Sequence, residues 1–307
     1  MAEGRKETIV MFPFMCQGHI IPFLALSLQL EQRGFNVLFV NTPLNIQKLH
    51  HSIPPSSAIR LRELPFHSSD HHGLPPSAEN CDSLPYPLVI NFLQASRSLL
   101  PHFRSLLEDL VRSGDPPLAV VGDIFFGWSA EVANELGLFH AVFSVSGGFG
   151  MACYYSTWLN LPHLKTDSPE FSLPDFPEAG KFHVTQLAES YLAADGNDPW
   201  SGFQRENLSA WSTKSNGVLF NSISEFDETG LAYFEHKLNR QVMMGDSVKG
   251  IEMRKRAGEA KEVFRDAVRS DELKGSSVRA MSDFLDAAIL MKEKTKSVDK
   301  QLDSTVP

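Results

Sequence analysis

The sequence of 307 residues has only three cysteines, which lie far apart and form no CxxC pair. An odd number of separated cysteines argues against a disulfide framework and against a zinc ribbon, and it favours a reducing compartment. Apolar runs are short as well: none reaches the roughly 18 residues of a membrane-spanning helix. The apolar stretch at residues 9–14 is too short for the core of a signal peptide. We therefore expect a cytoplasmic protein without a membrane span.

An excess of basic residues is also missing. Lys and Arg number 28 against 37 Asp and Glu, which gives a net charge of −9. A mildly acidic chain without a basic stripe argues against nucleic acid as the main partner. Apolar residues make up 42% and charged residues 21%, so a sizeable core can form and general disorder is excluded. The length predicts about two domains or one large α/β unit.

Proline and charge divide the chain near residue 240. Eighteen of the 19 prolines lie before this point, whereas 25 of the 67 residues at 241–307 are charged, against 40 of the first 240. We predict a loop-rich α/β lobe at 1–240 and a helical tail at 241–307. Apolar residues recur at helical spacing at 253–268 and again at 278–288, with Gly275 between the two stretches.

Strand and helix patterns alternate in the first part. Compact apolar runs predict strands at 8–12, 36–40, 59–64, 118–121, 139–144 and 217–220. Helical patterns run over 22–33, 88–112 and 128–136, and a loop rich in Pro and Asp is expected around 161–200. This alternation predicts an α/β fold with a Rossmann-like parallel sheet and helices on both faces.

A histidine and an aspartate follow two strands that are expected to be neighbours. His19 comes after the first strand, and Asp123 ends the fourth. In the common 3-2-1-4 strand order, the carboxyl ends of strands one and four meet at the switch point where ligands bind. A carboxylate can orient an imidazole, which then removes a proton from a hydroxyl near neutral pH. The pair is therefore a candidate general base for activating an alcohol or phenol.

Other interpretations of these residues remain open. An isolated loop histidine is more often a surface or core residue, and an aspartate that ends a strand is often a helix cap. A serine hydrolase using Ser144 or Ser146 with His19 and Asp123 is a minority hypothesis, because the local sequence is not G-x-S-x-G.

Two ligand motifs find little support. The first loop lacks GxGxxG, the fingerprint of dinucleotide binding. Side chains that could bind a metal gather at 67–72, but Ser, Gly and Pro around them favour a solvated loop; the four are His67, Asp70, His71 and His72. The aromatic stretch at 149–158 is more often core than ligand wall, although it could line an apolar pocket beside the crevice.

Longer strings resemble the plant UDP-dependent glycosyltransferases of family 1. They are IVMFPFMCQGHIIPFLALSLQL at 9–30, GLPPSAEN at 73–80, VVGDIFFGWSAEVANELGL at 120–138, GVLFNSISEFDE at 217–228, and KGIEMRKRAGEA with KGSSVRAMSDFL in the tail. Together they run through nearly the whole chain in the order of the family. The resemblance implies the two-lobed GT-B fold, in which the N-terminal lobe holds the acceptor and the C-terminal lobe the nucleotide sugar.

The resemblance also implies roles for individual residues. His19 matches the catalytic base of the family and Asp123 its acidic partner. The family transfers a sugar from a UDP-sugar, a co-substrate, to a small hydroxylated metabolite, with inversion at the anomeric carbon and without a metal. We expect a phenolic or terpenoid acceptor and no resident cofactor, and we predict these acceptor-binding residues: Gly18, Phe14, Phe125, Ser146 and Phe149.

The donor-binding signature of the family is the main departure. Its His-Cys-Gly-Trp-Asn-Ser core is absent from the sequence, so we name no donor-binding residue and expect the second Rossmann lobe to be largely missing. The tail at 241–307 would then be a remnant of that lobe, and its last helix is expected to dock on the first lobe. Two hypotheses follow: a glycosyltransferase that is inactive or much weakened, or a non-catalytic fragment from an altered transcript or gene model that binds metabolites or partners.

Overall fold

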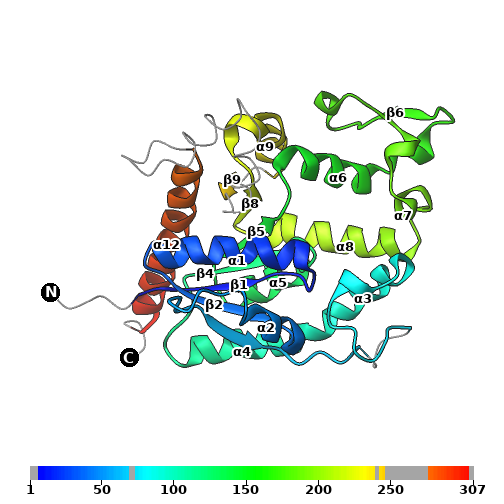
Figure 1. Cartoon of the computed structure of the whole chain (residues 1–307). Helices are drawn as coiled ribbons and strands as arrows, with labels where there is room; N and C mark the ends of the chain where they lie inside the picture. Colours follow the sequence, from blue (N-terminus) through cyan, green and yellow to red (C-terminus); the bar gives the residue numbers. More distant parts are fainter. Residues whose placement is uncertain (1–5, 69–72, 239–241, 246–275, 304–307) are drawn as a thin grey trace.

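Seven parallel strands form the central sheet of the computed structural model, which describes residues 6–68, 73–238, 242–245 and 276–303 (Figure 1). In chain order the strands are β1 (Thr8–Phe12), β2 (Asn36–Asn41), β3 (Arg60–Glu63), β4 (Ala119–Asp123), β5 (His140–Ser144), β8 (Gly217–Asn221) and β9 (Val242–Gly245). Their order across the sheet is β3-β2-β1-β4-β5-β8-β9. The α/β fold with its parallel sheet is confirmed, and the first six strands are those predicted.

Helices connect the strands and cover both faces of the sheet (Figure 1). They are α1 (Gln17–Gln32), α2 (Pro43–Leu49), α3 (Val89–Ala95), α4 (Leu100–Arg112), α5 (Gly127–Glu135), α6 (Gly148–Asn160), α7 (Glu189–Leu192), α8 (Pro199–Lys214), α9 (Ser224–Leu238) and α12 (Ser276–Asp303). A small antiparallel pair, β6 (Glu170–Ser172) with β7 (Lys181–His183), lies apart from the main sheet.

Alternate side chains of β1 divide the core between the two faces. Ile9 and Met11 pack in a cluster with residues of α1 and α12. Val10 and Phe12 pack in a second cluster with residues of α3, α4 and α5. All five residues of β1 are buried, as expected for a strand that is covered on both faces. The position of β1 is therefore tightly fixed, and with it the start of the loop that follows its carboxyl end.

The helices differ from the prediction at several places: α2, α6, α7, α8 and α9 lie where no helix was predicted. The helix expected over 88–112 is divided, because a 3₁₀ turn at Ser96–Leu99 separates α3 from α4. Pro101 lies in the first turn of α4, where its missing N–H is tolerated, whereas it would break a continuous helix. Helix α8 had no apolar pattern to reveal it, because its buried face includes Ser201, Gln204 and Asn207.

The tail joins the first lobe at two places. Strand β9 pairs with β8 just beyond the predicted boundary at residue 240. Helix α12 packs on the α1 face of the sheet through Met281, Phe284, Leu285 and Ala288, which confirms the docking expected for the stretch from residue 278. The helix expected over 253–268 lies outside the described residues.

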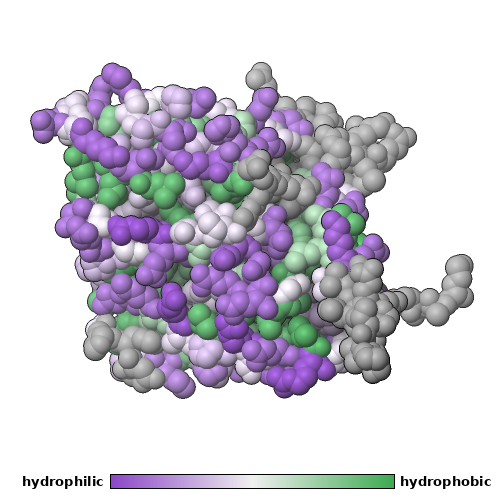
Figure 2. Space-filling model, turned by 180° about the vertical axis from the view of Figure 1, so that it is seen from behind, coloured by the Kyte–Doolittle hydropathy of each residue, from purple (hydrophilic) through white to green (hydrophobic). Residues whose placement is uncertain are grey.

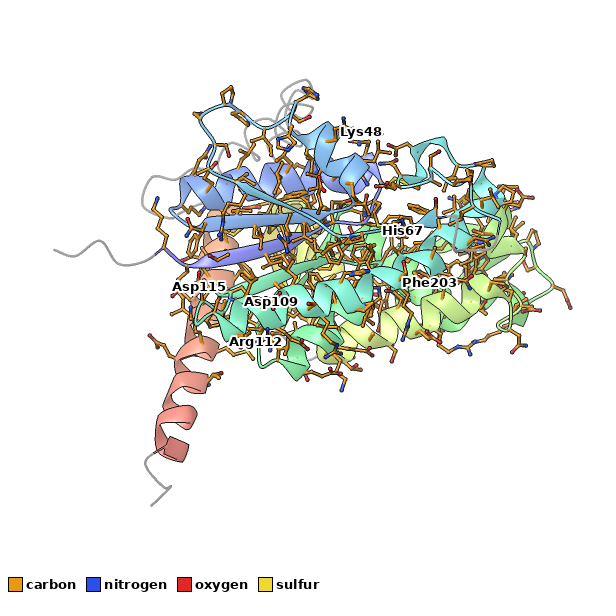
Figure 3. The ribbon with its side chains drawn as sticks, turned by 90° about the horizontal axis from the view of Figure 1, so that it is seen from below. Lys48, His67, Asp109, Arg112, Asp115 and Phe203 are labelled. Carbon is orange, nitrogen blue, oxygen red and sulfur yellow. A yellow bond between two sulfur atoms is a disulfide. The ribbon has the colours of Figure 1, made fainter. Side chains whose placement is uncertain are left out.

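The surface carries mixed polar groups. Seen from behind, it is largely hydrophilic and its hydrophobic residues form separate groups (Figure 2). On α4, for example, Arg112 pairs with Asp109 at 3.0 Å (Figure 3). No helix in the described ranges combines the length and the apolar character needed to cross a membrane.

Docking of α12 leads to a stability prediction. The ring of Phe284 is fully buried, with its centroid 5.8 Å from that of Phe139. Phe284→Ala should lower the free energy of unfolding by about 3–5 kcal/mol, because it removes the ring and leaves a cavity. Leu290→Ala, on the same helix but 53% exposed, should change it by less than about 0.5 kcal/mol. Equal urea midpoints for the two variants would show that α12 adds nothing to the core.

Candidate active site

His19 and Asp123 meet at the carboxyl edge of the sheet. Parallel pairing of β1 with β4 sets Phe12 opposite Gly122, so the two strands end side by side. His19 lies in the first turn of α1, directly after β1, and Asp123 is the last residue of β4. His19 Nδ1 lies 2.7 Å from Asp123 Oδ2, within hydrogen-bond distance. The structure therefore brings together two residues that are far apart in the sequence.

Burial fixes the orientation of this pair. The Asp123 side chain is fully buried, and that of His19 is 15% exposed. The second carboxylate oxygen, Oδ1, accepts a hydrogen bond from the N–H of Phe125 at 3.0 Å. Because a buried carboxylate needs hydrogen-bond donors, a proton on Nδ1 is favoured. Nε2 is then the ring nitrogen that can accept a proton from another molecule.

Aromatic rings surround the histidine. The ring centroids of Phe14 and Phe125 lie 5.7 and 5.2 Å from that of His19. Phe203 of α8 continues this row, 6.4 Å from Phe125 (Figure 3). Gly18, the residue before the histidine, is exposed, and a Cβ added there would meet open space. The surroundings of His19 thus combine apolar rings with an exposed glycine.

Ser146 and Phe149 lie in the loop and helix that follow β5, two strands from β1 along the same edge. Ser146 is exposed and its hydroxyl lies 2.9 Å from that of Ser144. Among the described residues neither hydroxyl bonds to His19, so the structure offers no support for a Ser-His-Asp triad. Phe149 is 39% exposed, and its ring lies 5.5 Å from that of Phe176.

A buried aspartate from α9 holds the start of α6. Asp227 accepts hydrogen bonds from the N–H groups of Gly148 and Phe149, at 3.0 and 2.9 Å. A carboxylate at a helix N-terminus satisfies N–H groups that lack intrahelical partners and faces the positive end of the helix dipole. Sequence reasoning missed this contact because the two segments are far apart and an aspartate in a helical stretch suggests a solvated face.

A further row of aromatic side chains joins α6, α8 and the turn before α3. Trp200 lies between Tyr86 and Trp158, with centroid distances of 6.2 and 6.3 Å. Asp198 caps α8 by accepting from the N–H groups of Trp200 and Ser201. Burial would raise the pKa of Asp198, but hydrogen bonds led by those from Ser201 outweigh it and lower the pKa to about 2. The cap therefore remains ionised and sets the start of the helix that carries Trp200 and Phe203.

A second histidine, His140, is buried inside the fold and bonds to serines, unlike His19 at the sheet edge. His140 of β5 is fully buried, and its ring nitrogens lie 2.9 Å from Ser129 Oγ and 2.8 Å from Ser215 Oγ. Burial lowers the pKa of His140 to about 3, so the ring stays neutral and connects β5 to two neighbouring segments. Of the stretch at 67–72, which we expected to be a solvated loop and not a metal site, His67 is exposed, and Asp70, His71 and His72 lie outside the described residues.

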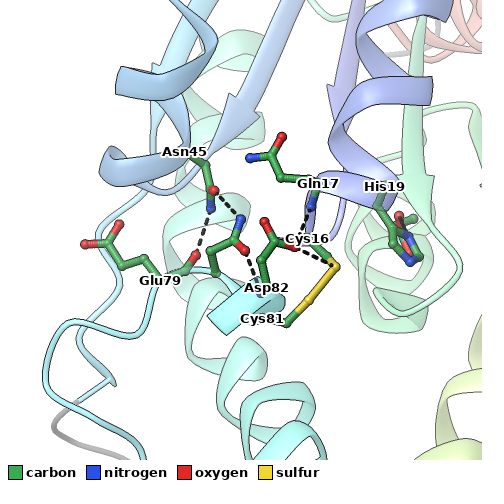
Figure 4. Close-up of a disulfide and its surroundings, with 9 residues drawn as sticks. Cys16, Gln17, His19, Asn45, Glu79, Cys81 and Asp82 are labelled. Carbon is green, nitrogen blue, oxygen red and sulfur yellow. Dashed lines mark hydrogen bonds and ion pairs between the residues drawn. A yellow bond between two sulfur atoms is a disulfide. The ribbon is translucent and has the colours of Figure 1, made fainter. Parts of the chain in front are cut away.

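The cysteines correct the sequence analysis. Cys16 and Cys81 form a disulfide across 65 residues, although the cysteine count argued against one (Figure 4). Spacing in the sequence carried no signal, because the contact arises from the fold: the N–H of Cys81 donates to the carbonyl of Met15 at 3.0 Å. Asp82 lies beside the pair, so two sulfur atoms and a carboxylate oxygen come within 4.8 Å of one another. Cys153 is free.

The contact between α6 and α9 can be tested at a glycine. A Cβ on Gly230 would overlap the backbone of Gly148 and Phe149, whereas one on Gly150 would meet nothing within 4 Å. Gly230→Ala should therefore lower the free energy of unfolding by about 1–3 kcal/mol or more. Gly150→Ala, in a helix, should be neutral or slightly stabilising. Thermal unfolding of both variants measures the difference, and an unchanged Tm for Gly230→Ala would contradict the packing described.

Comparison with known proteins agrees with this architecture. A family model described as "Glycosyltransferase, N-terminal domain" matches residues 6–167. UDP-glycosyltransferase 92A1 of Arabidopsis thaliana is 49% identical over 241 residues, which are 76% of this chain and 49% of that protein. Crocetin glucosyltransferase 3 of Crocus sativus is 47% identical over 230 residues, or 74% of this chain and 48% of that protein.

A solved structure shows the same fold. Glycyrrhiza uralensis UGT73P12, complexed with glycyrrhetinic acid 3-O-monoglucuronide, superposes with a TM-score of 0.63 at 22% identity, over 92% of this chain and 55% of that one. The chain spans about half the length of the curated relatives it matches. The family model and the shared fold show that the chain belongs to the plant family 1 UDP-glycosyltransferases and carries their N-terminal lobe.

Proposed function

We propose that the chain carries the acceptor half of a sugar transfer from a UDP-sugar to a hydroxyl group of a small metabolite. The observation that carries the proposal is the 2.7 Å contact of His19 Nδ1 with the buried carboxylate of Asp123. This contact leaves Nε2 directed to other partners and stabilises the imidazolium that forms when Nε2 takes up a proton. Membership of the family supports the same pairing of roles.

The proposed step conserves atoms and charge. His19 Nε2 removes the proton of the acceptor hydroxyl while its oxygen attacks the anomeric carbon of the sugar. A new carbon–oxygen bond forms on one face as the bond to the UDP oxygen breaks on the other, so the configuration inverts. UDP leaves with the electron pair of the broken bond. Asp123 keeps its contact with Nδ1 and acts as the orienting partner of the base.

We assign the acceptor to the edge of the sheet beside His19. Phe125 is partly exposed and supplies aromatic surface next to the base, and Gly18 leaves room for a ligand. Phe14, which we expected to bind the acceptor, is only 2% exposed and packs in the core behind these residues. Ser146 and Phe149 belong to the same edge through β5. Apolar walls with a few polar groups suit a phenolic or terpenoid hydroxyl compound. The name of Crocetin glucosyltransferase 3 and the glycyrrhetinic acid 3-O-monoglucuronide in the Glycyrrhiza uralensis structure agree with a small and largely apolar acceptor.

The donor half of the reaction needs contacts that this sequence does not carry. It has no His-Cys-Gly-Trp-Asn-Ser string, and it spans about half the length of its relatives. Positioning of the two reactants supplies several kcal/mol of rate enhancement in enzymes of this kind. We therefore propose that residues 1–240 form an acceptor-binding lobe, that 241–307 form its tail, and that the chain alone transfers sugar slowly or not at all.

A non-catalytic binding protein is the second candidate. A groove of about 790 Å³ between α3, α5 and α8 is lined by Phe203 and Trp128, among others. Trp128 is 6% exposed, and its Nε1 has no hydrogen-bond partner in the described part of the chain. A buried donor beside a groove of mixed polar and apolar lining favours a ligand with a hydrogen-bond acceptor. The two candidates make different predictions for UDP and for transfer.

Calorimetry on the full chain separates them first. We expect no saturable heat from UDP at millimolar concentration, because the donor contacts are missing, and measurable binding of a flavonol or triterpenoid at the acceptor edge. Phe125→Ala should weaken that binding by about tenfold, because it removes the partly exposed ring beside His19. Phe203→Ala, which changes the groove between α3, α5 and α8, serves as the comparison for ligand binding. Saturable UDP binding would contradict the assignment of this chain to the acceptor half alone.

The base is tested in a chimera. Residues 6–238 joined to the C-terminal half of UDP-glycosyltransferase 92A1 should transfer glucose from UDP-glucose. His19→Gln retains an amide that can bond to Asp123 but has no basic nitrogen, so the rate should fall about 10²–10⁴-fold with acceptor binding nearly unchanged. Asp123→Asn, which preserves the shape of the side chain, should also lower the rate. Full activity of His19→Gln would contradict the assignment of His19 as the general base.

A further inference from the structure

The disulfide ties the turn that carries His19 to the segment 79–83 (Figure 4). Cys16 is the N-cap residue of α1, and its carbonyl accepts hydrogen bonds from the N–H groups of His19 and Ile20, both at 2.9 Å. Cys81 begins a 3₁₀ turn, Cys81–Ser83, whose first N–H donates to Met15. A bond between the two sulfurs therefore acts on the backbone turn from which the imidazole projects.

Non-covalent contacts hold the same two segments together. The N–H of Gln17 donates to Asp82 Oδ1 at 3.2 Å. Asn80 caps the 3₁₀ turn through the N–H of Asp82 and donates to Asn45 of α2, both at 2.8 Å. These contacts do not depend on the sulfur–sulfur bond. They would keep the two cysteines as neighbours after reduction, so the bond can open and close again without unfolding the loop.

The surroundings also accommodate the reduced form. Asp82 Oδ1 lies 3.4 Å from Cys16 Sγ, so it can accept the S–H of a reduced Cys16. Both cysteines are partly exposed and Asp82 is exposed, which gives a reductant access to the bond. Disulfides are rare in reducing compartments, and those that occur there are usually transient and redox-sensing. The site therefore has satisfied contacts in two states, which is the requirement for a switch.

We propose that Cys16 and Cys81 form a reversible thiol–disulfide site that couples redox state to the geometry of the proposed catalytic base. Two electrons and two protons from a dithiol or from glutathione convert the disulfide into two thiols, and the reductant is oxidised to its own disulfide. Oxidation fixes the His19 turn against segment 79–83, whereas reduction leaves only the hydrogen bonds. Any effect of this change on acceptor binding rests on the proposed function. The opening of the disulfide and the greater freedom of the His19 turn do not.

Thiol counting on the full chain tests the bond. Oxidised protein should expose one thiol on denaturation, that of Cys153, and protein reduced in the presence of EDTA should expose three. EDTA is included because the two thiols with Asp82 form a donor set that a thiophilic cation could occupy. Glutathione buffers of increasing reduced fraction should convert the first state into the second reversibly. Three thiols in oxidised protein, or one thiol under all glutathione buffers, would overturn the proposal.

Hydrogen exchange tests the coupling. Amide protection of His19 and Ile20 should fall about tenfold on reduction, and the Tm should fall by about 5–10 °C, because a constraint on the unfolded chain is lost. Cys81→Ser should resemble the reduced protein in both redox states, and Cys153→Ser should keep the full response. Equal protection of the turn in oxidised and reduced protein would overturn the coupling. Failure of every phenol to bind would count against the proposed function only.

Discussion

A carboxylate that is completely removed from water is the constraint on which this site depends. Burying an ionised group costs several kcal/mol unless donors surround it. Asp123 obtains its donors from two places: the ring of His19, and the N–H of Phe125 two residues ahead. The first requires β1 and β4 to be neighbours in register; the second requires the chain to turn sharply after β4. The fold of the sheet edge and the orientation of the imidazole thus both serve to supply hydrogen-bond donors to the buried carboxylate.

The parts of the fold that follow from local patterns could be predicted. Strands β1, β4 and β5 are buried on both faces, so their sequences are short apolar runs bounded by turns. The meeting of His19 with Asp123 also followed, because parallel sheets of this kind place particular strand ends together. Their positions made the two residues a candidate general-base pair, and the family resemblance implied the same roles.

Other contacts between distant segments, which no regular strand order fixes, were beyond sequence reasoning. Helix α8 turns polar side chains inward, where Asn207 donates to the carbonyl of Ile124 and accepts from the N–H of Gly127, so no apolar stripe marks it. The pairing of Cys16 with Cys81 depends on the path of 64 intervening residues. The role of Asp227 as the hydrogen-bond acceptor at the start of α6 is visible only in the folded chain. In each case the sequence records the residue, and the partner is decided by the tertiary fold.

Helix α12 has a consequence for the way the chain reaches its native state. It covers the same face of β1 as α1 does, and Lys292 in the second half of the helix pairs with Glu7 just before that strand. Strand β1 therefore receives part of its cover from a helix that is synthesised more than 260 residues later. Contacts of such large sequence separation slow folding, because the chain must close a long loop before it gains them. Until α12 has been synthesised, an apolar strip beside β1 stays open to chaperones and to other nascent chains.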